Sequence, residues 1–156
     1  MAVITLETII HADIEVCFDL SRSIDLHCVS TAGTNEKAIA GCTSGLINLN
    51  ETVTWEATHF GLRQQLTSVI SAYERPFYFR DEQVKGAFKY IIHDHLFEMQ
   101  NGAVLMKDIF SYAAPFGWIG TIAEKTLLTP HLKKFLIERN NIIKEYAEGN
   151  RWKEFA

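Results

Sequence analysis

The sequence predicts an α+β domain in which one strand, one or two short helices, about six further strands and a long C-terminal helix follow one another. Between residues 51 and 112, apolar and polar side chains alternate with the period of a strand, and glycine, proline or asparagine separates the segments. Between residues 119 and 146, apolar residues recur at helical spacing with charged residues opposite. These two patterns indicate one sheet and one long amphipathic helix.

The N-terminal part predicts a strand followed by short helices. Residues 2–11 are rich in β-branched side chains and alternate loosely, which is typical of a strand. Asp13 offers a side-chain oxygen to cap a helix, and apolar residues then recur at helical spacing to about Val29. After the turn around Gly33, a second short strand is expected over residues 37–41.

The central part predicts a series of antiparallel strands. Residues 52–60 alternate strictly between apolar and polar positions, so they form the clearest half-buried strand of the chain. Asn101-Gly102 is a hairpin signal between the last two segments. The other strands are expected over residues 66–73, 77–81, 88–98 and 104–112.

The C-terminal helix is expected to bury one apolar side against the sheet. This side consists of Ile119, Ile122, Ala123, Leu127, Leu132, Phe135, Leu136, Ile142, Ile143 and Tyr146. Thr129-Pro130 interrupts the pattern. Because proline lacks an amide donor and clashes with the preceding turn, we expect a kink or a restart of the helix there.

Composition limits the classes of function. A chain of 156 residues fits one domain over residues 1–156, and its net charge of −4, without a basic cluster, argues against a nucleic-acid partner. No stretch approaches the roughly 20 apolar residues of a membrane span. Cys17, Cys28 and Cys42 leave one thiol unpaired in any disulfide scheme, which favours a reducing cytoplasm. We expect a cytoplasmic protein that is a monomer or a weak homodimer.

Several short motifs resemble those of one superfamily. They are Gly45-Leu46-Ile47, Glu51-Thr52-Val53-Thr54-Trp55, His59-Phe60-Gly61, Phe79-Arg80-Asp81 with Gln83, Gly86 and Phe88, His93-Asp94-His95-Leu96-Phe97, Asp108 with Tyr112, and Pro115-Phe116-Gly117. Together with the order of elements, they resemble the helix-grip superfamily, which includes birch pollen allergen and START-like lipid-transfer domains. More narrowly, they resemble its bacterial polyketide cyclase/dehydrase-like subgroup, some members of which are labelled cell division inhibitors. The chain differs from this subgroup in carrying Ile91 where relatives often have tryptophan.

The resemblance implies a helix-grip fold, with a curved antiparallel sheet of about six or seven strands wrapped around the long C-terminal helix. It also implies two short helices after the first strand, and a cavity between sheet and helix. The function expected from it is binding, transport or sensing of a small, mostly hydrophobic or aromatic molecule in that cavity. A cyclase/dehydratase-type lyase and an interaction protein that affects cell division are the alternatives.

The orientation of His93 and His95 decides whether they can reach this cavity. They share one strand face, because side chains repeat with period two. Periodicity alone leaves both orientations open: Ile91 and Phe97 would accompany the histidines inward, whereas Lys89 favours them outward. The resemblance favours the inward orientation.

The next strand adds an acidic group to the same interior. Lys107 should face solvent, which places Asp108 and Tyr112 inside. Asp108 could then hydrogen-bond an imidazole, either as part of a buried structural network or as part of a general acid–base pair. His93, His95 and Asp108 are therefore the candidate catalytic residues.

Two histidines on one strand, together with His59 and a carboxylate, also have the residue types of a metal site. Such histidine pairs are common without metal, and the resemblance implies no obligatory ion, so no metal or cofactor is expected. The expected ligand-binding residues are Trp55, His59, Phe79, His93, His95, Phe97, Asp108, Tyr112 and Phe116.

Overall fold

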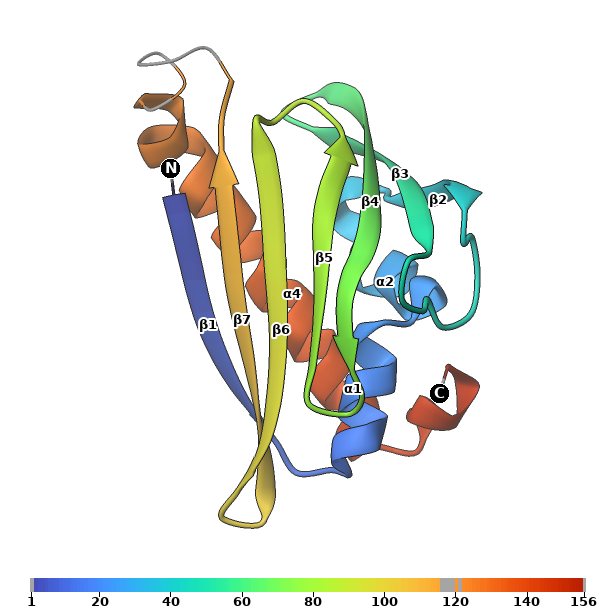
Figure 1. Ribbon diagram of the computed structural model, residues 1–156. Helices are drawn as coiled ribbons and strands as arrows, with labels where there is room; N and C mark the ends of the chain where they lie inside the picture. The colour runs from blue at the N-terminus through green and yellow to red at the C-terminus, as the bar shows by residue number, and fades with distance from the viewer. Residues whose placement is uncertain (1, 116–119, 121, 156) are drawn as a thin grey trace.

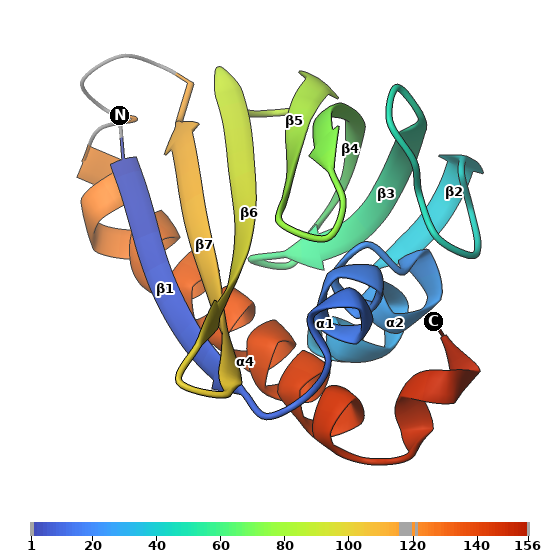
Figure 2. The same cartoon turned by 60° about the horizontal axis from the view of Figure 1, so that its bottom comes forward.

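The computed structural model describes residues 2–115, 120 and 122–155. Within these residues, seven antiparallel strands form one sheet in the order β1-β7-β6-β5-β4-β3-β2. The sheet curves around helix α4 (Thr129–Glu148), which crosses it obliquely (Figure 1). Figure 2 shows α4 and two short helices together on the concave side. The predicted fold class is confirmed.

The elements follow the predicted order. They are β1 (Ala2–Ile10), α1 (Ile14–Ser21), α2 (Ile24–Ser30), a short 3-10 turn (Ala32–Thr34), β2 (Lys37–Gly41), β3 (Thr52–His59), β4 (Leu62–Glu74), β5 (Tyr78–Lys85), β6 (Tyr90–Gln100), β7 (Ala103–Ala113), a π-helical turn (Glu124–Leu128), α4 and a final 3-10 turn (Arg151–Glu154). Strand β4 begins earlier than predicted because its first residues pair with the end of β3 across a tight turn, in which Phe60 and Gly61 have positive φ angles. Strand β5 also extends beyond the predicted end at Asp81.

Helix α1 is fixed at its start and along its buried side. Asp13 accepts a hydrogen bond from the backbone amide of Glu15, as a capping residue does, which confirms the predicted cap. Phe18 is fully buried and packs edge-to-face against three aromatic rings of the sheet, those of Tyr73, Phe79 and Phe97. These contacts hold α1 against the concave face.

The C-terminal helix restarts where proline predicted it. A π-helical turn precedes α4, and Pro130 lies in the first turn of α4, where its missing amide donor is tolerated. Ile122 and Leu127 are 54% and 60% exposed, so their predicted place in the core is wrong. The physical reason is the π-helical turn, whose extra residue rotates the earlier apolar positions away from the sheet.

From Pro130 onward, the buried side of α4 has the predicted helical period. Its buried residues are Leu136, Arg139, Asn140, Ile143, Tyr146 and Ala147. Two of these are polar, which the sequence did not predict. Ile119, which was predicted on the same side, lies outside the described residues.

Strand β6 turns its histidines inward. Ile91, His93, His95 and Phe97 alternate as the buried positions of the strand, and the histidines are 5% and 3% exposed. Lys89 pointed to the opposite orientation, but it lies before the strand begins and therefore does not share its alternation. The inward orientation favoured by the resemblance is confirmed.

Candidate functional site

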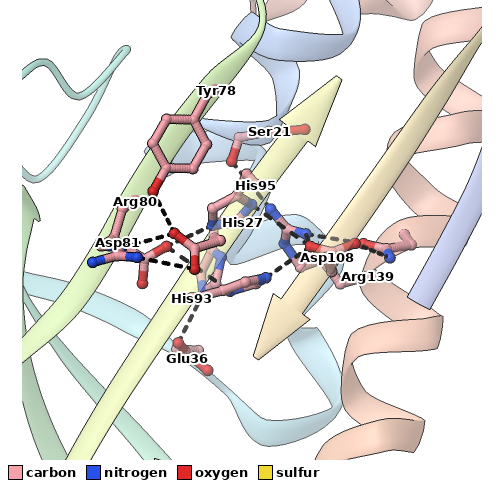
Figure 3. A network of polar contacts seen from close by, with 12 residues as sticks. Ser21, His27, Glu36, Tyr78, Arg80, Asp81, His93, His95, Asp108 and Arg139 are labelled. Atoms are coloured by element: carbon pink, nitrogen blue, oxygen red, sulfur yellow. Dashed lines mark hydrogen bonds and ion pairs between the residues drawn. The ribbon is translucent and has the colours of Figure 1, made fainter. Parts of the chain in front are cut away.

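Three adjacent strands place four ionisable side chains together on the concave face. Asp81 of β5 lies opposite His93 of β6, and His95 of β6 lies opposite Asp108 of β7. Figure 3 shows the two imidazoles between the two carboxylates. The register of the sheet therefore determines the geometry of this group, which we call the imidazole–carboxylate cluster.

Each imidazole spans the distance between both carboxylates. His93 Nε2 lies 2.7 Å from Asp108 Oδ1, and His95 Nε2 lies 2.6 Å from Asp81 Oδ2. The other ring nitrogens are farther from the opposite acids: His93 Nδ1 is 3.9 Å from Asp81 Oδ2, and His95 Nδ1 is 3.6 Å from Asp108 Oδ1. The two rings stack with their centroids 3.7 Å apart.

Helix α4 closes the Asp108 end of the cluster. Asn140 Nδ2 donates to Asp108 Oδ2 over 2.7 Å, and Arg139 Nη1 lies 3.6 Å from Asp108 Oδ1. Arg139 also donates to Asn140 Oδ1 and to the carbonyl oxygen of Ser21. Because Asp108 and Arg139 are only 1% and 4% exposed, these contacts compensate two charges that are removed from water.

The surroundings fix the protonation of most of the cluster. Burial, together with the neighbouring charge of His93, lowers the pKa of His95 to about 4. Burial alone would raise the pKa of Asp81 and of Asp108, but hydrogen bonds from His95 and His93 hold both values below the ordinary one. At neutral pH both acids are therefore ionised and His95 is neutral.

These charge states determine where the imidazole protons lie. An ionised carboxylate can only accept hydrogen bonds, so Nε2 of His93 and Nε2 of His95 are the donors. In its neutral form, His93 then keeps its lone pair on Nδ1, the nitrogen that faces Asp81. The cluster thus offers a basic nitrogen held in place by the hydrogen bond to Asp108.

A pocket of about 180 Å³ lies between the sheet and α4, and the cluster forms part of its wall. Asp81, His93, His95 and Arg139 line it on the polar side. Most of the remaining wall is apolar and includes Trp55, Phe79, Ile91, Phe110 and Phe135. An apolar pocket with a few fixed polar groups is the usual construction of a small-molecule site.

The predicted ligand-binding residues divide into three groups. Trp55, His59, Phe79, His93 and His95 line the pocket. Phe97, Asp108 and Tyr112 are buried and are not among the residues that line the pocket, but Asp108 contacts the pocket-lining His93. Phe116 lies outside the described residues.

His59 does not join the imidazoles of β6. Its Nδ1 lies 2.8 Å from Nε2 of His131 on α4, and burial lowers the pKa of both rings. The metal-binding combination considered from the sequence, with His59 as a ligand, is therefore not assembled. Instead, Asp81 lies beside His93 and His95, with one potential ligand atom of each within 4.8 Å of the others.

His27 and Glu36 form a further polar pair in the pocket wall, which was not predicted from the sequence. His27 Nε2 of α2 lies 2.8 Å from Glu36 Oε1, and the His27 ring packs against Trp55 with centroids 4.2 Å apart. Helical spacing could have identified Arg139 and Asn140, whose positions fall on the apolar side of α4. The pairing of His27 with Glu36 could not be predicted from the spacing of residues, because it joins a helix to the segment before β2.

Comparison with known proteins shows the fold. No protein-family model matches the chain, and no curated protein is similar to it in sequence. The crystal structure of TTHA0849 from Thermus thermophilus covers 91% of this chain and 97% of its own, with a TM-score of 0.70 and 12% identity. The major latex-like protein 151 of Panax ginseng covers 95% and 98%, with a TM-score of 0.69 and 16% identity. The chain has the helix-grip fold.

These comparisons support the fold alone, because the sequence identities to the solved structures are only 12% and 16%. A third helix-grip structure, protein Ms6760 from Mycobacterium smegmatis, has a TM-score of 0.67 at 15% identity and covers 92% of this chain and 88% of its own. The narrower resemblance to the bacterial cyclase/dehydrase-like subgroup stays a prediction. In the part of the helix-grip chain that the structure describes, no helix is both long and apolar enough to cross a membrane.

Proposed function

We propose that the chain binds a small, largely apolar molecule in the pocket between sheet and α4, as a carrier or a sensor. The observation that carries this proposal is an apolar pocket of about 180 Å³ whose polar side is a preorganised group of ionised and neutral side chains. The apolar wall would contribute affinity through burial, and the imidazole–carboxylate cluster would orient a polar group of the ligand.

The volume of the pocket limits the ligand in this conformation. A dry apolar cavity of about 150 Å³ holds a molecule the size of benzene, whereas pockets for drug-sized molecules are about 300–1,000 Å³. The pocket of about 180 Å³ therefore fits a single-ring compound with one or two polar substituents.

Partly filling the pocket should weaken binding without unfolding the chain. Ala57 of β3 is buried and lines the pocket, so Ala57→Phe is expected to weaken binding about tenfold or more, because displacing or overpacking the ring costs about 1–3 kcal/mol. Ser71→Phe, at an exposed position of β4, is the matched control. Compounds would first be identified by thermal-shift screening and by native mass spectrometry, and affinities then measured by calorimetry. Equal affinities in both variants would contradict the proposal.

The cluster also favours a second candidate function, a cyclase or dehydratase. His93 lines the pocket and donates Nε2–H to Asp108, which is how a carboxylate orients a general base. In a cyclic β-hydroxyketone, His93 Nδ1 would take the proton from the carbon between the carbonyl and the hydroxyl-bearing carbon, and the resulting enolate would break the carbon–oxygen bond. The hydroxyl would leave as water with the proton returned by His93, so that a ring double bond forms. The expected result is turnover that His93→Gln removes and that His11→Gln, at an exposed position outside the pocket, preserves, with both variants folded. Turnover equal in both variants would exclude this role.

We also propose that the chain works in the cytoplasm. Cys17, Cys28 and Cys42 are all free thiols in the structure, which supports a reducing compartment.

A further inference from the structure

The imidazole–carboxylate cluster contains the donor set of a metal site. Asp81 supplies a carboxylate, and His93 and His95 supply one ring nitrogen each, with all three ligand atoms within 4.8 Å of one another. Two imidazoles and one carboxylate are the ligands of many catalytic zinc and non-haem iron sites, which leave further positions open for water or substrate. From the sequence no ion is expected, since histidine pairs on strands are common without metal; the position of Asp81 opposite His93 comes from the strand register.

We propose that Asp81, His93 and His95 bind a divalent first-row transition ion, with zinc as the expected occupant, whose open position faces the pocket. This inference deepens the proposed function, since the ion would be the polar anchor of the ligand.

The donor atoms need only small movements to reach metal-binding geometry. Zinc–nitrogen and zinc–oxygen bonds of about 2.0–2.1 Å at tetrahedral angles separate neighbouring donors by about 3.3 Å. Asp81 Oδ2 is now 2.6 Å from His95 Nε2 and 3.9 Å from His93 Nδ1. Each of these two separations would change by less than about 1 Å, which a rotation of the Asp81 side chain can supply, and the two ring nitrogens lie within 4.8 Å of one another. Asp81 has freedom to rotate, because none of the described residues donates to its Oδ1 and its side chain is 29% exposed.

The remaining contacts would support the ligands. A metal-bound imidazole usually donates its other N–H to a carboxylate. His93 already donates Nε2–H to Asp108, and His95 would shift its proton to Nδ1, which lies 3.6 Å from the same acid. Phe79 stacks on His95 with centroids 4.0 Å apart, and Phe110 packs edge-on against His93, so both rings are fixed by apolar neighbours.

The charge of the cluster is compatible with a cation. Asp81 and Asp108 each carry one negative charge, and Arg139 carries one positive charge, which leaves a net charge of −1 around neutral imidazoles. Arg139 lies on the Asp108 side of the stacked rings, away from Asp81 (Figure 3). Asp108, 3.6 Å away, compensates the charge of Arg139, which also lines the pocket.

The first measurement is the metal content of the untagged chain, purified without chelators or metal-affinity resin. Mass spectrometry of the elements is expected to find close to one zinc or iron ion per chain. After removal of the metal, titration with Co(II) should produce the visible absorption bands of a four- or five-coordinate ion. A chain without bound metal that leaves Co(II) with the spectrum of the hydrated ion would overturn the inference.

The Co(II) affinity of variants tests which residues bind the ion. Asp81→Asn and His95→Gln should each lower Co(II) affinity about 100-fold or more, and Asp108→Asn, which acts through His93, about 10–100-fold. The matched control is His131→Gln, which breaks the other imidazole pair and should retain the ion. Circular dichroism confirms folding of each variant. Loss of the ion in the control, with retention in Asp81→Asn, would place the metal elsewhere.

Ligand binding separates this inference from the proposed function. Compounds found by screening should bind the metal-loaded chain at least about tenfold more tightly than the stripped chain, because the ion supplies the polar anchor. Equal affinity for both forms would overturn the metal inference while leaving the carrier function intact. Binding by neither form would count against the carrier function, whether or not the ion is held.

Discussion

Asp108→Ala is expected to lower the free energy of unfolding by about 3–5 kcal/mol. The substitution would leave the buried guanidinium of Arg139 without its anionic neighbour and remove the acceptor of two hydrogen bonds, from His93 and Asn140. A buried charge that loses its partner retains its desolvation penalty, which is the reason for the large effect. Urea unfolding at neutral pH, in the presence of a chelator, measures it.

Asp94→Ala is the matched control for this prediction. Asp94 lies between the two histidines in the sequence, but its carboxylate pairs with Arg80 and Tyr78, and Arg80 is 38% exposed. Loss of such a partly solvated ion pair should cost about 1 kcal/mol or less. Arg139→Met combined with Asp108→Ala should destabilise by clearly less than the sum of the single effects, because the two charges compensate each other. Additive effects, or equal losses for Asp108 and Asp94, would contradict the prediction.

The second large effect concerns pH. In the folded chain, burial and the charge of His93 lower the pKa of His95 to about 4, whereas an unfolded histidine has a pKa near about 6.5. Above a pH of about 6.5 the group is neutral in both states and does not reduce stability. As the pH falls from about 6.5 to about 4, the unfolded chain binds a proton that the folded chain does not, so stability falls by roughly 3 kcal/mol. Below this window, the contribution of His95 no longer changes.

Urea unfolding of the metal-free chain across this pH window tests the prediction. His95→Gln should flatten the curve, since it removes the proton that the unfolded chain takes up. His59 and His131 also have lowered pKa values and contribute in the same direction, so the comparison is made within a His131→Gln background as well. Parallel curves for His95→Gln and its parent would show that His95 does not determine the pH dependence.

The sequence predicted most of the fold because the sheet has regular alternation. Residues 52–60 and 104–112 could be assigned to strands from polarity alone, and Thr129-Pro130 marked the restart of the C-terminal helix. The π-helical turn before α4 was not predictable, because one extra residue in a turn hardly changes the apolar pattern of the sequence. In the structure this turn places Ile122 and Leu127 in solvent.

The site was harder to predict, because its residues meet only through tertiary structure. Asp81 was placed at the end of a strand, and its position opposite His93 depends on the β5–β6 register, which the residues alone do not specify. Arg139 and Asn140 occupy the correct helical positions, but arginine is rarely buried, so sequence reasoning assigns it to solvent. Asp108 was placed correctly, because Lys107 next to it indicated which face of the strand is wet.

The two faces of the β5–β6 hairpin carry different ionisable groups, and this difference makes the register of the hairpin specific. Arg80 and Asp94 pair on one face, while Asp81, His93 and His95 meet on the other. A slip of one residue would reverse the faces of one strand relative to the other: it would either bury the Arg80 guanidinium among aromatic rings or expose the imidazoles of β6. The same ionisable groups that form the pocket wall therefore also discriminate against mispaired hairpins while the chain folds.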